Sequence, residues 1–134
     1  MSSITEIEGV GPSYASKLAD AGVKTVAGLL KAGASAKGRA KLAEATGISG
    51  KRILRWVNHA DLFRIDGGAG EHAELLEAAG VDTVVELATR KPTNLAEALA
   101  ATNEERKLVR SVPTLAEVKK WVAQAKELPR VVTH

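Results

Sequence analysis

The chain contains no cysteine, and this absence excludes disulfides, thiol catalysis and thiolate metal sites. Aromatic residues make up only 3% of the sequence, so a hydrophobic core has to be built from alanine, leucine, valine and isoleucine. These residues are typical of close-packed helices. No apolar run approaches the roughly 20 residues of a membrane span, and no basic leader precedes an apolar segment. We therefore expect a soluble, cytoplasmic protein.

The sequence also lacks the usual motifs of catalysis and metal binding. No serine lies in a nucleophile-turn motif, and no glycine-rich loop is followed by a lysine and hydroxyl pair. The three histidines lack the spacing of a metal site, so each is expected to be an ordinary surface residue: His59, His72 and His134. We expect no enzyme, no metal site and no small-molecule substrate.

The size of the chain suits one ordinary domain or two small halves that share a core. It has 134 residues, of which 45% are hydrophobic. No alternating apolar pattern indicates a strand, whereas apolar residues recur at helical spacing. The predicted fold class is all-α: tandem units over residues 1–62 and 63–134, packed as one compact pseudo-twofold domain.

A segment near the start of the chain recurs in altered form 58 residues later. It contains two glycines that flank an apolar residue, followed by alanine and leucine at helical spacing, which suits a tight turn between helices. Composition alone predicts roughly two identities in this alignment. The observed identities are Ile7/Ile65, Gly9/Gly67, Ala15/Ala73, Leu18/Leu76, Ala21/Ala79, Gly22/Gly80, Val23/Val81, Thr25/Thr83, Val26/Val84 and Leu29/Leu87.

Capping and stop signals divide each half into short helices. In the first half, Pro12 suits the first turn of a helix, Thr25 can cap the next, and a basic helix should end near Gly47. In the second half, Thr83 and Glu86 have the spacing of a full capping box, and a helix can restart at Asn94 after a turn.

Two tryptophans occupy comparable places near the ends of the two units, which extends the repeat beyond the turns. All four aromatic residues could in principle stack on bases. Their helical spacing with aliphatic neighbours makes core packing the better expectation for Tyr14, Trp56, Phe63 and Trp121.

Charge is distributed unevenly along the chain. Residues 1–66 carry a net charge of +4 and residues 67–134 one of −1. Between residues 31 and 55, Glu44 is the only acidic residue, and the run is either a solvated face or the footprint of a polyanion. Its basic members are Lys31, Lys37, Arg39, Lys41, Lys51, Arg52 and Arg55.

The segment Ile7–Leu18 resembles a helix-hairpin-helix motif, whose signature is an apolar-x-Gly-apolar-Gly turn followed by alanine and leucine. Over nearly its full length, including residues 60–65, 75–84 and 125–132, the chain resembles a bacterial family of uncharacterised function built on paired motifs of this kind, domain of unknown function 4332. The helix-hairpin-helix class implies sequence-independent binding of the DNA backbone by two hairpins. Its hairpins often hold a monovalent cation through backbone carbonyls, so the resemblance allows such an ion and no other cofactor.

Backbone amides at a glycine turn and at the start of the following helix favour a phosphate, because both point outward and the helix dipole adds positive potential. In this sequence the first hairpin and its neighbours offer backbone amides for a phosphate, and the second hairpin offers those of its two glycines. The basic run adds positively charged side chains. The candidate nucleic-acid-binding residues are Gly9, Val10, Gly11, Ser13, Lys17, Lys51, Arg52, Arg55, Gly67 and Gly68.

The second hairpin departs from the motif. Ala69 stands where the first hairpin has Gly11, and Asp66 and Glu71 lie close by, although Glu8 occupies the place of Asp66 in the first hairpin. Carboxylates near a phosphate site weaken binding, so a packing role is the better expectation for this hairpin. The leading hypothesis is a non-enzymatic module that binds nucleic acid, duplex DNA above all, without sequence preference. A protein-interaction adaptor is the alternative.

Overall fold

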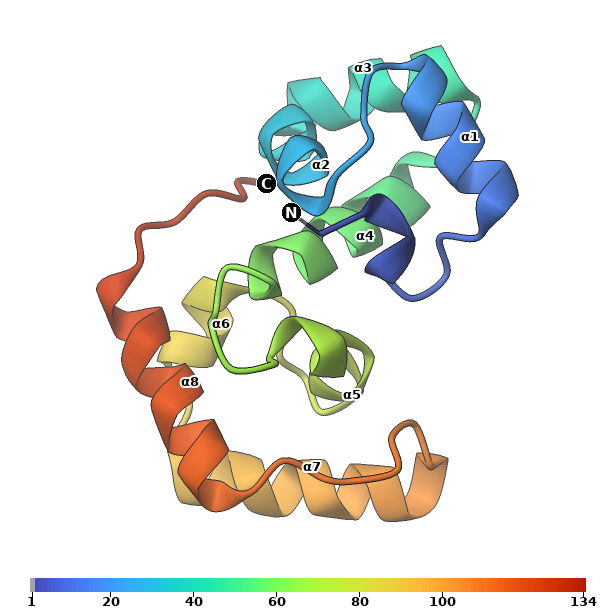
Figure 1. Cartoon of the computed structure of the whole chain (residues 1–134). Coiled ribbons are helices and arrows are strands. Elements are labelled where there is room, and N and C mark those ends of the chain that lie inside the picture. Colours follow the sequence, from blue (N-terminus) through green and yellow to red (C-terminus); the bar gives the residue numbers. More distant parts are fainter. Residues whose placement is uncertain (1) are drawn as a thin grey trace. The chain divides into compact units, whose positions relative to one another are not determined.

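The computed structural model describes residues 2–134, and every regular element among them is a helix (Figure 1). The predicted all-α class is confirmed. Contacts divide the chain into two compact units: unit 1 contains the chain up to Asp61 together with Val131–His134, and unit 2 contains Leu62–Arg130. The sequence-based boundary places the last four residues in the second half, whereas here they pack with unit 1.

Unit 1 consists of five short helices. They are the 3₁₀ helix η1 (Ile4–Glu6) and the α-helices α1 (Pro12–Asp20), α2 (Val26–Gly33), α3 (Ala36–Thr46) and α4 (Gly50–Leu62), whose last residue belongs to unit 2. The Thr25 hydroxyl caps α2 by accepting the Gly28 N–H at 2.9 Å, and α3 ends at Gly47 with φ 73°. Both predictions are confirmed, since each rests on local chemistry alone.

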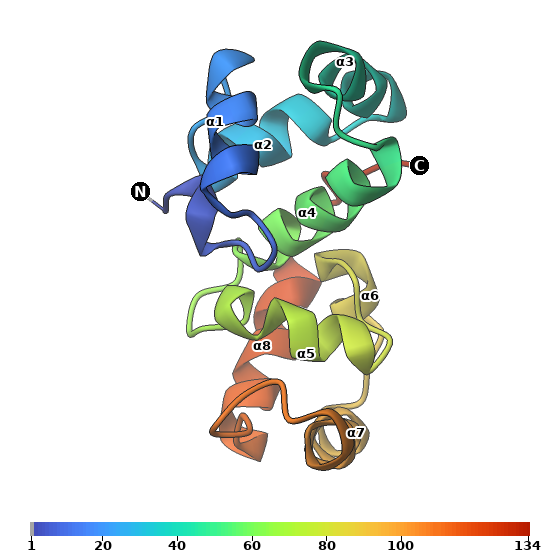
Figure 2. The same ribbon diagram turned by 90° about the vertical axis from the view of Figure 1, so that its right-hand side faces the viewer.

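Unit 2 contains η2 (Gly70–His72), α5 (Ala73–Ala78), α6 (Val84–Ala88), α7 (Pro92–Arg106) and α8 (Leu115–Glu127), and α8 packs against α6 and α7 (Figure 2). The predicted restart at Asn94 is wrong, because Pro92 itself is the first residue of α7. Proline is favoured there, as its missing N–H has no partner to lose in the first turn.

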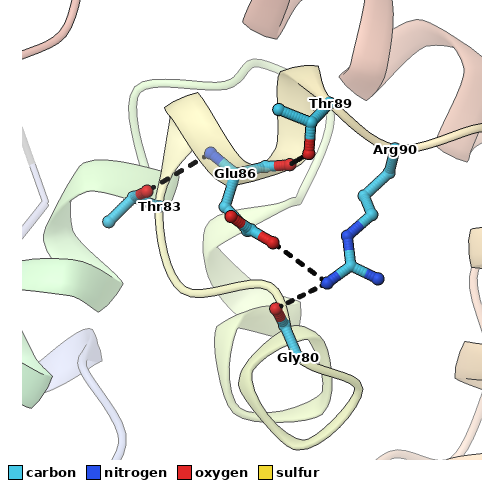
Figure 3. A network of polar contacts seen from close by, with 5 residues as sticks. All are labelled: Gly80, Thr83, Glu86, Thr89 and Arg90. Carbon is cyan, nitrogen blue, oxygen red and sulfur yellow. Dashed lines mark hydrogen bonds and ion pairs between the residues drawn. The ribbon is translucent and has the colours of Figure 1, made fainter.

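The predicted capping box at Thr83 is only half formed (Figure 3). The Thr83 hydroxyl accepts the Glu86 N–H at 3.4 Å, but the Glu86 carboxylate turns to Arg90 at 3.0 Å. Arg90 Nη2 also donates to the Gly80 carbonyl at 2.8 Å. Arg90 therefore fastens the end of α6 to the turn that precedes it.

The two tryptophans are the largest buried side chains, each 1% exposed. Trp121 lies in the apolar core of unit 2. The prediction of core packing is confirmed for Trp56 and Trp121, whereas Tyr14 and Phe63 are half-buried. The Phe63 ring fills the space where Gly70 has no Cβ.

The repeated segments have matching backbone geometry. Val23 N–H donates to the Leu18 carbonyl at 2.8 Å, and Val81 N–H donates to that of Leu76 at the same distance. The glycines of these two turns have positive φ, 87° at Gly22 and 94° at Gly80. The glycines at the start of the two repeated segments do as well, with 92° at Gly9 and 97° at Gly67. These angles favour glycine because a Cβ is strained there.

Candidate functional site

The first turn, Gly9–Gly11, packs against the protein on one side and is exposed to solvent on the other. Val10 is 4% exposed, and its N–H donates to the Ile7 carbonyl at 3.1 Å, so the prediction that this amide points outward to a phosphate is wrong. A Cβ on Gly9 would lie 3.4 Å from Trp56 Nε1, so this backbone runs close against the indole. Gly9 and Gly11 are both exposed, and nothing lies within 4 Å of a Cβ built on Gly11.

The helix that follows this turn begins without a side-chain cap. Gly11 is the N-cap residue of α1 and has no side chain to donate or accept, and Pro12 is at the first position. Pro12 and Ser13 are exposed. The positive end of the helix dipole at α1 therefore faces outward without an internal acceptor from a capping side chain.

Two cations flank the tyrosine of α1. Lys17 Nζ lies 5.9 Å and Arg52 Cζ 5.0 Å from the centroid of the Tyr14 ring. The ring of Tyr14 meets Trp56 edge-on, with centroids 5.0 Å apart. Because Trp56 also lies against Gly9, these contacts connect the first turn to α1 and α4. We call Tyr14, Lys17 and Arg52 the Tyr14 cluster.

The remaining predicted cations of α4 lie next to this cluster in sequence. Lys51 precedes Arg52, and Arg55 follows it by three residues, so Arg52 and Arg55 are neighbours on the helix surface. All three are exposed. The Ser49 hydroxyl accepts the Arg52 N–H at 3.2 Å and caps the start of α4.

Arg39 does not belong to the basic surface, and its inclusion in the polyanion footprint was wrong. It is 7% exposed, and its guanidinium donates to the carbonyls of Gly33 at 2.9 Å, Ala34 at 3.1 Å and Thr133 at 2.7 Å. Two further arginines hold backbone carbonyls: Arg64 that of Pro129 at 2.7 Å, and Arg90 that of Gly80. The sequence shows how many charges a segment carries, but only the fold shows which of them are exposed to solvent.

The carbonyls of the second turn are occupied by donors of unit 2. Gln124 Nε2 donates to the Asp66 carbonyl at 2.8 Å, and Trp121 Nε1 donates to that of Gly67 at 3.0 Å. His72 Nδ1 lies 2.9 Å from the Gly68 carbonyl and donates in its Nδ1-protonated tautomer. Sequence reasoning missed Gln124 and His72, although the repeated tryptophan already marked this stretch of α8.

Negative charge also lies against the second turn. Asp66 is exposed, as is Glu8, the equivalent residue of the first turn. The exposed Glu71 stands where the first turn has Ser13, and a Cβ on Gly68 would lie 3.6 Å from Glu71 Oε2. Ala69 and Gly70 are buried, whereas Gly11 and Pro12, the equivalent residues of the first turn, are exposed. The two turns therefore share a backbone conformation at their first glycine and differ in accessibility and charge.

The histidines match their predicted surface positions only in part. His59 is 1% exposed, so the prediction is wrong for this residue, which lies among core residues of α4. His72 is half-buried, with its ring centroid 5.5 Å from that of Trp121, and His134 is exposed.

Within residues 2–134, no three His, Asp or Glu side chains are grouped so as to hold a metal ion. Within the same residues, no helix combines the length and apolar character of a membrane span.

The chain belongs to the family described as "Domain of unknown function (DUF4332)", whose model matches residues 8–128. Comparison of the chain with curated proteins and with solved structures found no match. The family description assigns no activity, so the function has to be argued from the geometry of the site.

Proposed function

We propose that this member of the family binds the backbone of nucleic acid, without sequence preference and without catalysis, through the first turn and the cations beside it. The observation that carries the proposal is the convergence of Lys17 and Arg52 on Tyr14, next to an exposed glycine turn and an uncapped helix start. Amides and cations gathered in this way suit a phosphate.

We interpret both turns as hairpins of helix-hairpin-helix motifs, which the repeated glycine angles and hydrogen bonds support. Only the first is proposed as a phosphate contact. At the second, Glu71 lies against Gly68 and the residues Ala69 and Gly70 are buried, which disfavours a phosphate. Internal donors also hold three consecutive carbonyls there. The same donors occupy the oxygens that a monovalent cation needs, so we place no ion at that turn.

Binding through one turn and its neighbouring cations should be modest. With about three phosphates contacted, the logarithm of the binding constant should fall with the logarithm of the salt concentration at a slope of about −3. The expected dissociation constant is on the order of 10⁻⁴ to 10⁻⁶ M. A salt titration with duplex DNA, single-stranded DNA and RNA measures both quantities.

The matched variants are charge reversals in the two units. Lys17→Glu combined with Arg52→Glu should weaken binding at least tenfold at low salt, while Lys119→Glu combined with Lys126→Glu, which is charge-matched on exposed residues of α8, should weaken it far less. Equal effects of the two pairs would show a diffuse charge effect and contradict the site. Absence of binding at low salt would contradict the function.

The alternative is a docking surface for a protein. It predicts a defined protein partner that survives nuclease treatment and a binding constant that depends little on salt. Loss of all partners on nuclease treatment would exclude it in favour of nucleic acid.

A further inference from the structure

The last residues of the chain are held in unit 1 as an extended peptide (Figure 1). Thr133 N–H donates to the Ala34 carbonyl at 2.8 Å, and the Thr133 carbonyl accepts from Arg39 Nη2 at 2.7 Å. Val132, the residue before, is 3% exposed. Thr133 thus uses both its main-chain N–H and its carbonyl in hydrogen bonds to unit 1, and the neighbouring Val132 buries its apolar side chain.

The groups that receive this segment are positioned by α2 and α3 themselves. Arg39 Nη1 donates to the carbonyls of Gly33 and Ala34, at 2.9 and 3.1 Å, so the guanidinium is fixed by bonds other than the one to Thr133. Gly33 is buried, and a Cβ there would collide with Val57. The close approach at Gly33 brings the end of α2 against the core, with its carbonyls turned to Arg39.

This arrangement has the chemistry by which proteins bind extended peptides. Main-chain hydrogen bonds hold the peptide, and a buried side chain at one position selects it. The contacts are few, so they suffice when the peptide is part of the same chain, where the effective concentration is on the order of 10⁻³ M. The same peptide added in solution would compete with the attached segment at a similar concentration.

We propose that the C-terminal end of α2, with Arg39, is a binding site for an extended peptide, and that its occupant is the segment Val131–His134, held reversibly and replaceable by the same segment of a second copy. The site selects a valine followed by a residue with a free main-chain N–H and carbonyl. This proposal does not depend on the proposed nucleic-acid function.

The absence of cysteine allows a direct test on the full chain. His134→Cys introduces a single thiol for a fluorescent label at the exposed end of the segment. A synthetic peptide of residues 129–134 should displace the labelled segment and lower its anisotropy, with half the effect on the order of 10⁻³ M. The same peptide carrying Val132→Asp should need at least about tenfold more, because the apolar contact is lost. An unchanged anisotropy at saturating peptide, or equal effects of both peptides, would overturn the proposal.

A second measurement uses a chain whose own segment is released. Full-length Val132→Asp should bind the labelled wild-type peptide at least about tenfold more tightly than the wild-type chain does, because its site is vacant. Adding Arg39→Gln should abolish this gain, while Lys41→Gln, an exposed cation of the same helix, should not. A folded Val132→Asp chain, shown by circular dichroism, that fails to bind the peptide would contradict the proposal. If that variant does not fold, the displacement experiment on the labelled chain decides.

Discussion

Trp121 Nε1 donates a 3.0 Å hydrogen bond to the carbonyl oxygen of Gly67, and the equivalent indole in unit 1, that of Trp56, lies against Gly9. Each unit therefore places a buried tryptophan of its last long helix against its first glycine turn, and in unit 2 a hydrogen bond joins the two. The apolar ring anchors the helix, and its polar edge meets the turn. This relationship leads to the first prediction.

Replacement of Trp121 should separate the packing of the ring from its hydrogen bond. Trp121→Ala should lower the free energy of unfolding by about 3–5 kcal/mol, because a large buried ring is lost. Trp121→Phe should cost less, but still about 1–2 kcal/mol beyond the change in volume, because the Gly67 carbonyl loses its donor. Denaturant unfolding followed by circular dichroism measures both, with Lys126→Ala on the same helix as the control. Equal stability of Trp121→Phe and the wild type would show that the bond contributes nothing.

The glycines of the first turn should differ in their tolerance of a side chain. Gly9→Ala should destabilise unit 1 by about 1–2 kcal/mol, because φ 92° is strained for an L-residue. Gly11→Ala should cost less, about 0.5 kcal/mol, because its backbone is extended, with φ −85°, and the space beside it is open, so the remaining cost is that alanine is a poorer N-cap residue than glycine. Thermal unfolding of the two single variants tests this contrast. A reversed order would mean that the turn is not held as described.

Two arginines of unit 1 should have separable roles. Arg39→Ala should destabilise unit 1 by about 2–3 kcal/mol, because three carbonyls lose a charged donor, yet leave the salt slope of nucleic-acid binding unchanged. Arg52→Ala should reduce the magnitude of that slope by about 1 and leave stability within about 0.5 kcal/mol. Unfolding curves and salt titrations on both variants form the experiment. A reduced slope in a folded Arg39→Ala chain would contradict the structural role of Arg39.

Acid should weaken the start of α8. The Thr114 backbone N–H, which donates to the Glu117 carboxylate at 3.0 Å, and then the Thr114 hydroxyl lower the pKa of Glu117. A depressed pKa in the folded state stabilises above the unfolded value of about 4.3, and this contribution is lost as pH falls through the folded pKa. Thr114 and Glu117 form the capping box seen in the structure.

The measurement is a series of thermal unfolding curves between neutral pH and strong acid. Glu117→Gln should lose less of its unfolding temperature on acidification than the wild type, because it lacks the titrating group. Glu127→Gln, at the far end of the same helix, serves as the control. An identical pH dependence in the wild type and Glu117→Gln would show that the cap has no effect on stability.

Much of the local structure could be predicted, because it depends on neighbours in sequence. The caps at Thr25 and Ser49 and the stop at Gly47 each involve residues within a few positions of one another. The incomplete box at Thr83 shows where such reasoning ends. The Glu86 carboxylate binds Arg90 instead of closing the box at Thr83, and Arg90 also donates to the Gly80 carbonyl.

The site was predicted only in part. The sequence indicates both Lys17 and Arg52 as candidates, but their meeting at Tyr14 depends on how α1 packs on α4. The sequence gives no sign that Arg39 is buried, because a run of charges looks the same whether or not one of its members lies inside the fold. The burial of Arg39 depends on Thr133, 94 residues away in sequence.

The sequence by itself determined the helical class, the repeat of the glycine turns and the caps, because these follow from backbone conformation and short-range hydrogen bonding. Only the tertiary structure decided which turn is open and which is closed, since Gln124, Trp121 and His72 reach the second turn through the packing of α8 and η2. Long-range contacts select among groups that are equivalent in sequence, because burial and a donor within hydrogen-bonding distance are properties of the folded chain.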